Sequence, residues 1–345
     1  MSRPANKAAY LHATNTRLSV QESPYPTLAT PDSILIKTKA VAINPVDTAI
    51  QTLGPACFTF ITLPTILGFD VAGQVLAVGS GVTRFQVGDR VAGLAENGLQ
   101  EYTLLVEHLT VKLPSGEGER VTWEQAATLP MGVSVSTKML FDEELLGMKL
   151  PTAEQKAVNG ETVLIWGGST SMASCAIQLA VAAGYEVITT ASPHNFDYVK
   201  KLGASQVFDY NDPHIRDQLL AAFKDKTTAG AVANGGILDD RGAEIVEICA
   251  AVVKSCPGKR FVAMTMVPTW GPSFEGVELK FVEPLKGRHE IASAVFHEYL
   301  PAALASGAFQ PAPKAEVVGH GLEAAQEAFE TLKKGVSAKK IVITI

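Results

Sequence analysis

The chain has 345 residues, of which 47% are hydrophobic and 19% charged, and its net charge at pH 7 is −6. This length predicts two domains, and the composition excludes a disordered chain. The acidic balance argues against nucleic acid as a partner, and no apolar run approaches the ~20 residues of a membrane span. The first residues have no signal-peptide pattern, so we expect a cytoplasmic protein.

Cysteine and histidine are dispersed along the chain. No two of the four cysteines have a C-x-x-C spacing, and none lies beside a histidine. Structural and catalytic zinc sites need three or four converging ligands. The sequence therefore predicts no metal site and buried thiols.

The first third of the chain reads as short strands separated by glycine turns. The short runs are residues 34–36, 71–75, 88–91 and 102–106. Together they predict a small β-rich domain over residues 32–111. Helical spacing follows over 124–129 and again over 134–148, where Pro151 ends it.

From Glu161 onward strands and helices alternate, which is typical of a parallel sheet with crossover helices. The predicted strands are 162–166, 185–190, 206–208, 229–233 and 260–266, and the predicted helices are 174–183, 196–202, 212–223 and 242–253. A last helix (322–334) and strand (340–345) return to the first domain. The fold class is α/β, with a doubly wound dinucleotide-binding (Rossmann) domain. Residues 267–283 are expected to be a loop that includes Trp270 and Phe274.

A glycine-rich turn follows the first strand of this second domain. It reads Gly167-Gly168-Ser169-Thr170-Ser171-Met172-Ala173 and precedes a helix. In the pattern G-x-G-x-x-G/A, Gly168 and Ala173 fit and Thr170 replaces the middle glycine. The hydroxyls of this turn could donate to a pyrophosphate at the helix N-terminus. The alternative is a tight turn that binds nothing.

The second strand ends in Thr190-Ala191-Ser192-Pro193-His194-Asn195, without Asp or Glu. Enzymes that use the unphosphorylated dinucleotide normally place a carboxylate there, on the ribose 2′-hydroxyl. NADP is therefore favoured over NAD. Ser192, His194, Asn195 and Tyr210 could hold the 2′-phosphate, whereas the alternative for Ser192-Pro193 is a helix cap.

Motifs across the chain resemble the medium-chain dehydrogenase/reductase superfamily. The motifs are Asn44-Pro45-Val46-Asp47-Thr48, Gly68-Phe69-Asp70-Val71-Ala72-Gly73, Val87-Gly88-Asp89-Arg90-Val91, Leu129-Pro130, Gly167–Thr170, Ser192–Asp197 and Val336–Lys340. Within the superfamily the chain is most similar to the zinc-free branch of quinone reductases and fungal trans-acting enoyl reductases, which are partners of polyketide synthases. The resemblance implies a GroES-like domain (1–125 and 300–345) and a Rossmann domain (126–299).

The resemblance also implies NADPH as cofactor and hydride transfer to an activated C=C bond. It places the nicotinamide against Val46, Asp47 and Thr48, with a late contact at Ser337 and Ala338. It places the phosphates on Gly168 and Ser169, Thr170, Ser171 and Met172, and the 2′-phosphate on Ser192, Pro193, His194, Asn195 and Tyr210. It implies catalytic roles for Asn44, Asp47 and Ser134, with an acyl pocket near 134–137. It implies no metal, since Gly68-Phe69-Asp70 replaces the Gly-His-Glu of zinc alcohol dehydrogenases.

Three positions depart from the family. Ala49 replaces a lysine or tyrosine, Val135 replaces a hydroxyl residue, and Ala233 replaces an aspartate. The first hypothesis is an NADPH-dependent enoyl reductase of polyketide or other secondary metabolism, acting on a small or carrier-tethered substrate. The second is a quinone or alkenal reductase on free small molecules. The third is a non-redox protein that cyclises or binds a polyketide. Both a monomer and a homodimer, paired through strand 260–266, remain open.

Overall fold

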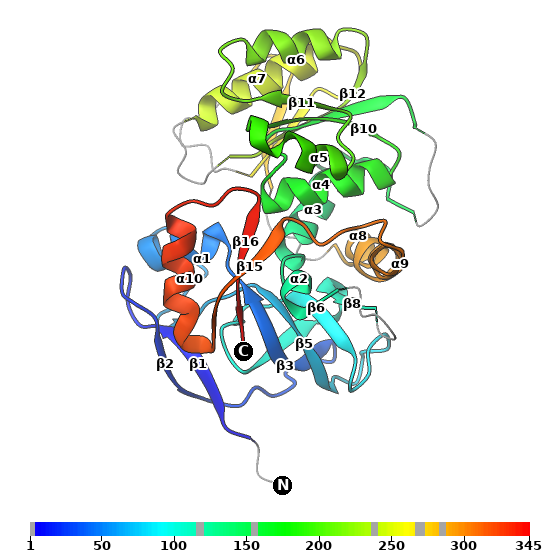
Figure 1. The fold of residues 1–345 in the computed structure, drawn as a ribbon. Helices are drawn as coiled ribbons and strands as arrows, with labels where there is room; N and C mark the ends of the chain where they lie inside the picture. Colours follow the sequence, from blue (N-terminus) through cyan, green and yellow to red (C-terminus); the bar gives the residue numbers. More distant parts are fainter. Residues whose placement is uncertain (1–3, 115–120, 153–157, 236–240, 266–272, 283–287) are drawn as a thin grey trace. The chain divides into compact units, whose positions relative to one another are not determined.

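The structure is a computed structural model that describes residues 4–114, 121–152, 158–235, 241–265, 273–282 and 288–345. By their contacts the residues form two compact units. One comprises Met1–Met131 and Leu300–Ile345, and the other Gly132–Tyr299. The first unit holds two sheets and the second one sheet in the described residues (Figure 1). Each unit has its own hydrophobic core.

The first unit is built on a large, mostly antiparallel sheet. Its order is β15-β16-β3-β5-β6-β8, and β7 also pairs with β3. The strands are β3 (Ser33–Ala42), β5 (Asp70–Val78), β6 (Arg90–Leu94), β7 (Tyr102–Val106), β8 (Thr110–Lys112), β15 (Lys314–His320) and β16 (Lys339–Thr344). A smaller sheet has the order β2 (Ser19–Ser23), β1 (Asn6–Leu11) and β4 (Thr65–Ile66).

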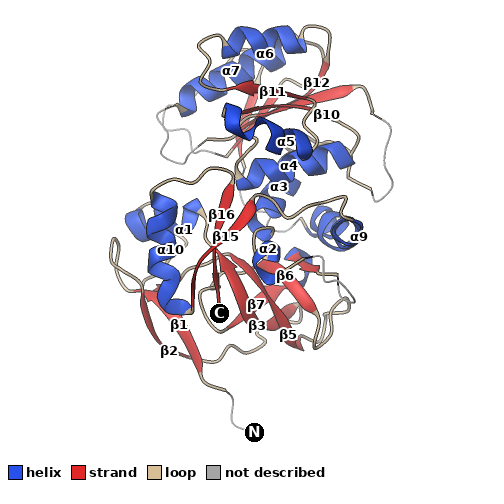
Figure 2. Cartoon of the chain, viewed as in Figure 1, coloured by secondary structure: helices blue, strands red, loops and turns tan. Residues whose placement is uncertain are grey.

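Helices cover the first unit's core. They are α1 (Pro45–Leu53), α2 (Trp123–Ala126), α9 (Leu300–Ser306) and α10 (Ala325–Lys333), with short 3₁₀ turns at 54–56, 107–109 and 322–324. Helix α1 packs against α10, as Figure 2 shows. Pro45 begins α1, where its missing N–H costs no hydrogen bond. Buried side chains of β3, β16 and α10, among them Ile36, Ile341 and Phe329, join one core.

The second unit holds a parallel sheet with the order β11-β10-β9-β12-β13-β14 in the described residues. The strands are β9 (Glu161–Ile165), β10 (Glu186–Ala191), β11 (Gln206–Asp209), β12 (Thr227–Ala233), β13 (Phe261–Met264) and β14 (Glu278–Phe281). The strand order reverses beside β9, and ligands of such sheets bind at the carboxyl ends of the strands at this point.

The helices of the second unit connect these strands or flank them in sequence. They are α3 (Pro130–Phe141, which begins in the first unit), α4 (Ser171–Ala182), α5 (Phe196–Lys201), α6 (Ile215–Phe223), α7 (Gly242–Ser255) and α8 (His289–Ser293); a 3₁₀ turn at 193–195 and a π-helical turn at 294–299 complete the set. Helix α4 packs on β9 and β10, and α7 packs on α6, β12 and β13. The α/β fold with a doubly wound domain is thereby confirmed.

Two predicted elements were wrong in extent. The helix predicted over 134–148 is α3, which begins at Pro130 and ends at Phe141. A turn follows, in which Gly147 has φ +56 and its N–H donates to the carbonyl of Asp142. Leu145 and Leu146 are buried in this turn. Because these two apolar residues fit the spacing of a helix, the sequence pattern wrongly predicted that the helix continues past Phe141.

The segment 267–283, predicted to be a loop, contains the parallel strand β14. Strand β13 therefore pairs on both sides and is not an edge, because β14 lies outside it. Strand β14 was not predicted because its four residues alternate charged with apolar side chains and form no buried apolar run. Trp270, and Met266 at the end of the predicted fifth strand, lie outside the described residues. Over the described part of the chain, no helix has the length and apolarity that crossing a bilayer requires.

Candidate functional site

The glycine-rich turn joins β9 to α4, and Thr170 is the residue that caps the helix. Its Oγ1 accepts a hydrogen bond from the Ala173 N–H at 3.3 Å and another from Asn234 Nδ2 at 2.7 Å. A hydroxyl has two acceptor sites and one hydrogen. Because both acceptor sites are used, the Thr170 O–H remains as a donor at the start of α4, where the side chain is exposed.

The two glycines of the turn are required by its geometry. Gly167 has φ +74, which side chains rarely adopt. A Cβ on Gly168 would overlap Oγ1 of Thr189. Thr189 is fully buried and donates to the Ile165 carbonyl, so it cannot easily move away. The turn therefore keeps its backbone bare next to the helix N-terminus, which is the arrangement that a pyrophosphate needs.

Neighbouring polar groups hold this turn in place. The hydroxyl of Ser174 donates to the Gly168 carbonyl at 3.2 Å and lies 2.8 Å from the hydroxyl of Tyr198. Ser136 on α3 donates to the Met172 carbonyl at 2.9 Å. Ser169, Ser171 and Met172 are half-buried. The buried Oγ of Ser171 has no hydrogen-bond partner among the described residues, which leaves it available to a ligand.

Ser192 and Tyr210 meet at the carboxyl ends of β10 and β11. The two hydroxyl oxygens are 2.6 Å apart. Ser192 does precede a 3₁₀ turn over 193–195, but its side chain makes no capping hydrogen bond, so the capping alternative fails for this hydroxyl. Pro193 and His194 are exposed, and Asn195 is 7% exposed. Asn195 thus presents little surface, while the hydroxyl pair lies at the predicted 2′-phosphate position.

The predicted nicotinamide-side residues lie at the start of α1, around a buried polar cluster. Asn44 Nδ2 donates to Asp70 Oδ2 at 2.9 Å, and Lys340 Nζ donates to Asn44 Oδ1 at 2.5 Å. The same ammonium lies 2.8 Å from Asp70 Oδ2. None of the three residues is more than 4% exposed. The three residues lie in separate motifs of the sequence, and nothing in those motifs predicts this contact.

Asp47 shares this cluster and is fully buried. Its Oδ2 accepts from the Asn44 N–H at 2.8 Å and its Oδ1 from the Gly68 N–H at 2.9 Å. The pKa of Asp47 is raised to about 7, chiefly by burial and also by the nearby Asp70, although these two hydrogen bonds and the charge of Lys340 lower it. In this structure Oδ2 of Asp47 holds Asn44 at the beginning of α1, and Oδ1 ties α1 to Gly68, which lies between β4 and β5.

The remaining predicted residues lie on α1, just before β16, or on α3. Val46 and Thr48 are half-buried on α1, and the Thr48 hydroxyl donates to the Pro45 carbonyl at 2.9 Å. Ser337 is exposed, and Ala338 adopts φ +47 just before β16, which carries Lys340. Ser134, on α3 in the second unit, is 1% exposed.

The pKa of Asp47 makes stability depend on pH. The carboxyl takes up a proton below about pH 7 in the folded chain but only near its ordinary value of 3.8 when unfolded. The stability that it contributes is therefore complete below about pH 4 and is lost as the pH rises to about 7. We expect Asp47→Asn to flatten the dependence of the unfolding free energy on pH over this window, measured by chemical denaturation. An unchanged slope would contradict this assignment.

The polar cluster does not suit a zinc ion. Among the described residues, no three His, Cys, Asp or Glu side chains converge in a way that could hold a metal. Beside Asp70 and Asn44 the protein places the ammonium of Lys340, which would repel a metal cation. The donor set therefore fits an ion pair and not the metal of the zinc alcohol dehydrogenases.

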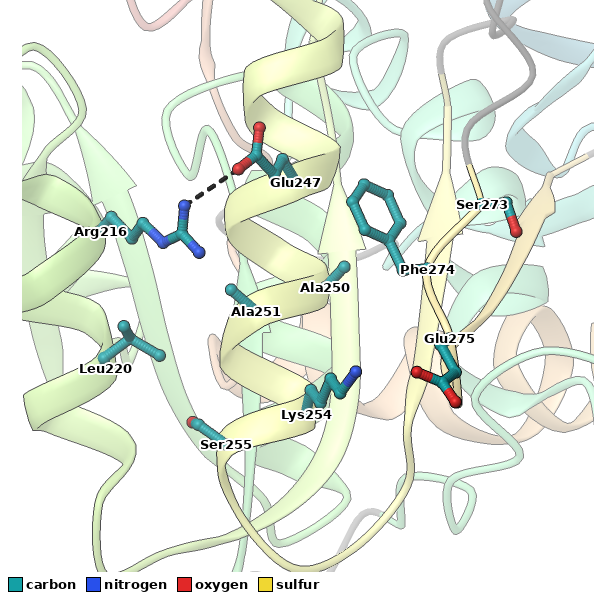
Figure 3. Close-up of a pocket in the computed structure, with 10 residues that line it drawn as sticks. All are labelled: Arg216, Leu220, Glu247, Ala250, Ala251, Lys254, Ser255, Ser273, Phe274 and Glu275. Carbon is teal, nitrogen blue, oxygen red and sulfur yellow. Dashed lines mark hydrogen bonds and ion pairs between the residues drawn. The ribbon is translucent and has the colours of Figure 1, made fainter.

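A pocket of about 550 Å³ opens elsewhere in the second unit, between α6, α7 and residues 273–275. Figure 3 shows Arg216 of α6 paired with Glu247 of α7, at 2.9 Å, across its rim. Ala250 and Ala251 leave space on α7, and Phe274 lies opposite them. None of the predicted site residues lines this pocket, so it is separate from the candidate site.

Comparison with known proteins agrees with this architecture. Residues 30–115 match the family model of the alcohol dehydrogenase GroES-like domain. The chain is 46% identical to dehydrogenase azaJ of Aspergillus niger over 99% of both chains. It is 35% identical to trans-enoyl reductase himH of Aspergillus japonicus, over 90% of this chain and 89% of that protein.

A solved structure, that of the CurK enoyl reductase, has the same fold. It superposes with a TM-score of 0.75 at 20% identity and covers 98% of this chain and 99% of its own. The chain belongs to the medium-chain dehydrogenase/reductase superfamily, in the fungal branch that contains dehydrogenases and trans-enoyl reductases.

Proposed function

We propose that the protein is an NADPH-dependent, zinc-independent reductase of activated C=C bonds, acting as a trans-enoyl reductase in secondary metabolism. The observation that carries the cofactor choice is the hydroxyl pair of Ser192 and Tyr210, beside the end of β10, an end that carries no carboxylate. A relative that is 35% identical and named a trans-enoyl reductase supports the substrate class, an α,β-unsaturated acyl group.

The cofactor would be held by three groups of residues. The turn residues Gly168, Ser169, Thr170, Ser171 and Met172 would bind the pyrophosphate, and Ser192, Pro193, His194, Asn195 and Tyr210 would surround the 2′-phosphate. Val46, Asp47 and Thr48, with Ser337 and Ala338, would face the nicotinamide side. When bound, NADPH supplies the hydride that reduces the C=C bond.

The protein itself would orient the Asn44 amide and would place no side-chain proton donor at three positions that are polar in the family. The amide of Asn44 is fixed by Lys340 and Asp70, so it keeps one orientation at the start of α1. Ala49, Val135 and Ala233 offer no side-chain proton donor. We therefore propose that water supplies the proton for the α-carbon.

The substrate carrier is a further part of the proposal. Resemblance to trans-acting enoyl reductases implies an acyl chain delivered by a polyketide synthase. An enoyl group on an acyl carrier protein should then be reduced with a higher kcat/KM than the same group on a small thiol. Equal values would favour a reductase of free small molecules, such as quinones or alkenals.

The cofactor assignment predicts selective effects of two conservative variants. Ser192→Ala and Tyr210→Phe should each raise the Kd for NADPH about 5- to 10-fold, because each removes a hydrogen bond to a phosphate. The Kd for NADH should stay within about 2-fold of wild type. Calorimetric titration measures both values.

Ser205→Ala is the matched control. Ser205 precedes β11 at its other end, where its hydroxyl donates to the Val187 carbonyl at 2.9 Å. This variant should leave both dissociation constants unchanged. Equal losses of NADPH and NADH affinity in Ser192→Ala and Tyr210→Phe would remove these hydroxyls from the 2′-phosphate site.

A further inference from the structure

An arginine outside all of the sequence motifs lies against Tyr210. Arg241 precedes α7 and donates from Nη2 to the Tyr210 carbonyl at 2.8 Å and from Nη1 to Asn211 Oδ1 at 3.1 Å. Its guanidinium carbon lies 5.7 Å from the centre of the Tyr210 ring. The hydroxyl of that ring is the one that meets Ser192.

The proposed 2′-phosphate site needs a positive charge. Such a phosphate carries up to two negative charges, and arginine recognises phosphate with a planar set of donors. Ser192, Tyr210 and Asn195 contribute only neutral side chains. Arg241 brings a permanent charge to this place, 31 residues along the chain from Tyr210.

The contacts of Arg241 fix its position without burying its charge. The side chain is 40% exposed, and Nε lies 3.3 Å from Glu244 Oε2, itself 54% exposed. An ion pair as exposed as this one is weak, so Glu244 competes little with a phosphate for the guanidinium. The two hydrogen bonds to residues 210 and 211 keep the guanidinium over the end of β11.

We propose that Arg241 is a specificity-determining residue that selects the 2′-phosphorylated dinucleotide by pairing with its 2′-phosphate. This inference rests on the proposed function and adds the charged residue to its cofactor site. It also assigns Tyr210 a second task, since its carbonyl and ring hold Arg241 beside the hydroxyl pair.

The test compares dissociation constants for NADPH and NADH, and for the fragments 2′,5′-ADP and 5′-AMP, in wild type and Arg241→Ala. The variant should raise the dissociation constants for NADPH and 2′,5′-ADP about 10- to 100-fold, because it removes a charge-assisted contact. Binding of NADH and 5′-AMP should change less than about 2-fold. Arg241→Lys, which keeps the charge and loses the planar donors, should be intermediate.

Arg216→Ala is the matched control. Arg216 is an exposed arginine of the same unit, paired with Glu247 as Arg241 is with Glu244. This control should change none of the four constants. Parallel loss of NADPH and NADH binding in Arg241→Ala would show a merely structural role and overturn the inference.

The wild-type protein separates the inference from the function on which it rests. If wild type prefers NADPH and Arg241→Ala retains the full preference, the inference alone is overturned. If wild type binds NADH as tightly as NADPH, the proposed cofactor and the inference both fail.

Discussion

Replacing Lys340 by methionine is expected to lower the free energy of unfolding by about 3–5 kcal/mol, which is the usual cost of removing one partner of a buried ion pair. Lys340 is 4% exposed and its partner Asp70 is fully buried. Asp70 accepts hydrogen bonds from Asn44 and from the Met131 N–H, but neither carries a charge. Removing the ammonium therefore leaves Asp70 and the neighbouring Asp47 uncompensated. Urea denaturation measures the difference.

The adjacent lysine provides a matched control. Lys339 pairs with Glu316 on the surface at 2.5 Å, and the two side chains are 49% and 39% exposed. Lys339→Met should cost less than about 1 kcal/mol. The double variant Lys340→Met with Asp70→Asn should recover part of the loss, because the carboxylate of Asp70 is then no longer left unpaired. A cost for Lys340→Met as small as that for Lys339→Met would contradict the buried cluster.

Gly168→Ala is expected to weaken binding of NADPH and NADH together, about 10-fold or more, and to destabilise the fold by about 1–3 kcal/mol. The new Cβ would overlap Oγ1 of Thr189 and lie 3.1 Å from Cδ1 of Ile177. The turn must then move away from the start of α4, where both cofactors would place the same pyrophosphate. Calorimetric titration and thermal unfolding measure the two effects.

Adding Thr189→Ala to this variant removes the atom that the new Cβ meets. The double variant should bind both dinucleotides more tightly than Gly168→Ala alone, even though Thr189 also loses its hydrogen bond to Ile165. If Gly168→Ala binds both dinucleotides as wild type does, the turn is not the pyrophosphate site.

Much of the second unit could be predicted because its signals are local. A short apolar run is enough to predict a buried strand such as Glu161–Ile165, and the glycines that follow it are enough to predict the turn. Ser192 and Tyr210 could also be brought together, since neighbouring parallel strands end at one edge. Strand β14 escaped prediction because Glu278 and Lys280 interrupt its apolar residues, and its backbone pairing with β13 is a tertiary contact.

The contacts that complete the candidate site depend on tertiary structure. Lys340 contacts Asn44, which lies 296 residues away in the sequence. No pattern in the residues near Lys340 predicts that its ammonium group will be buried. Arg241 directly precedes α7 and belongs to no motif, so only the folded structure reveals that it lies against Tyr210. Family resemblance named Asp47 for its motif position, whereas its hydrogen bonds to Asn44 and Gly68 show how it shapes the start of α1.

The most direct test of the proposed function is a stoichiometric turnover measurement with NADPH and an α,β-unsaturated acyl thioester. Loss of NADPH absorbance is followed, and the product is identified by mass spectrometry. The proposal predicts one saturated thioester formed for each NADPH oxidised, with a much smaller kcat/KM for NADH. A folded protein that binds neither dinucleotide and converts or retains a polyketide without consuming NADPH would contradict it, and would identify a non-redox member of the superfamily.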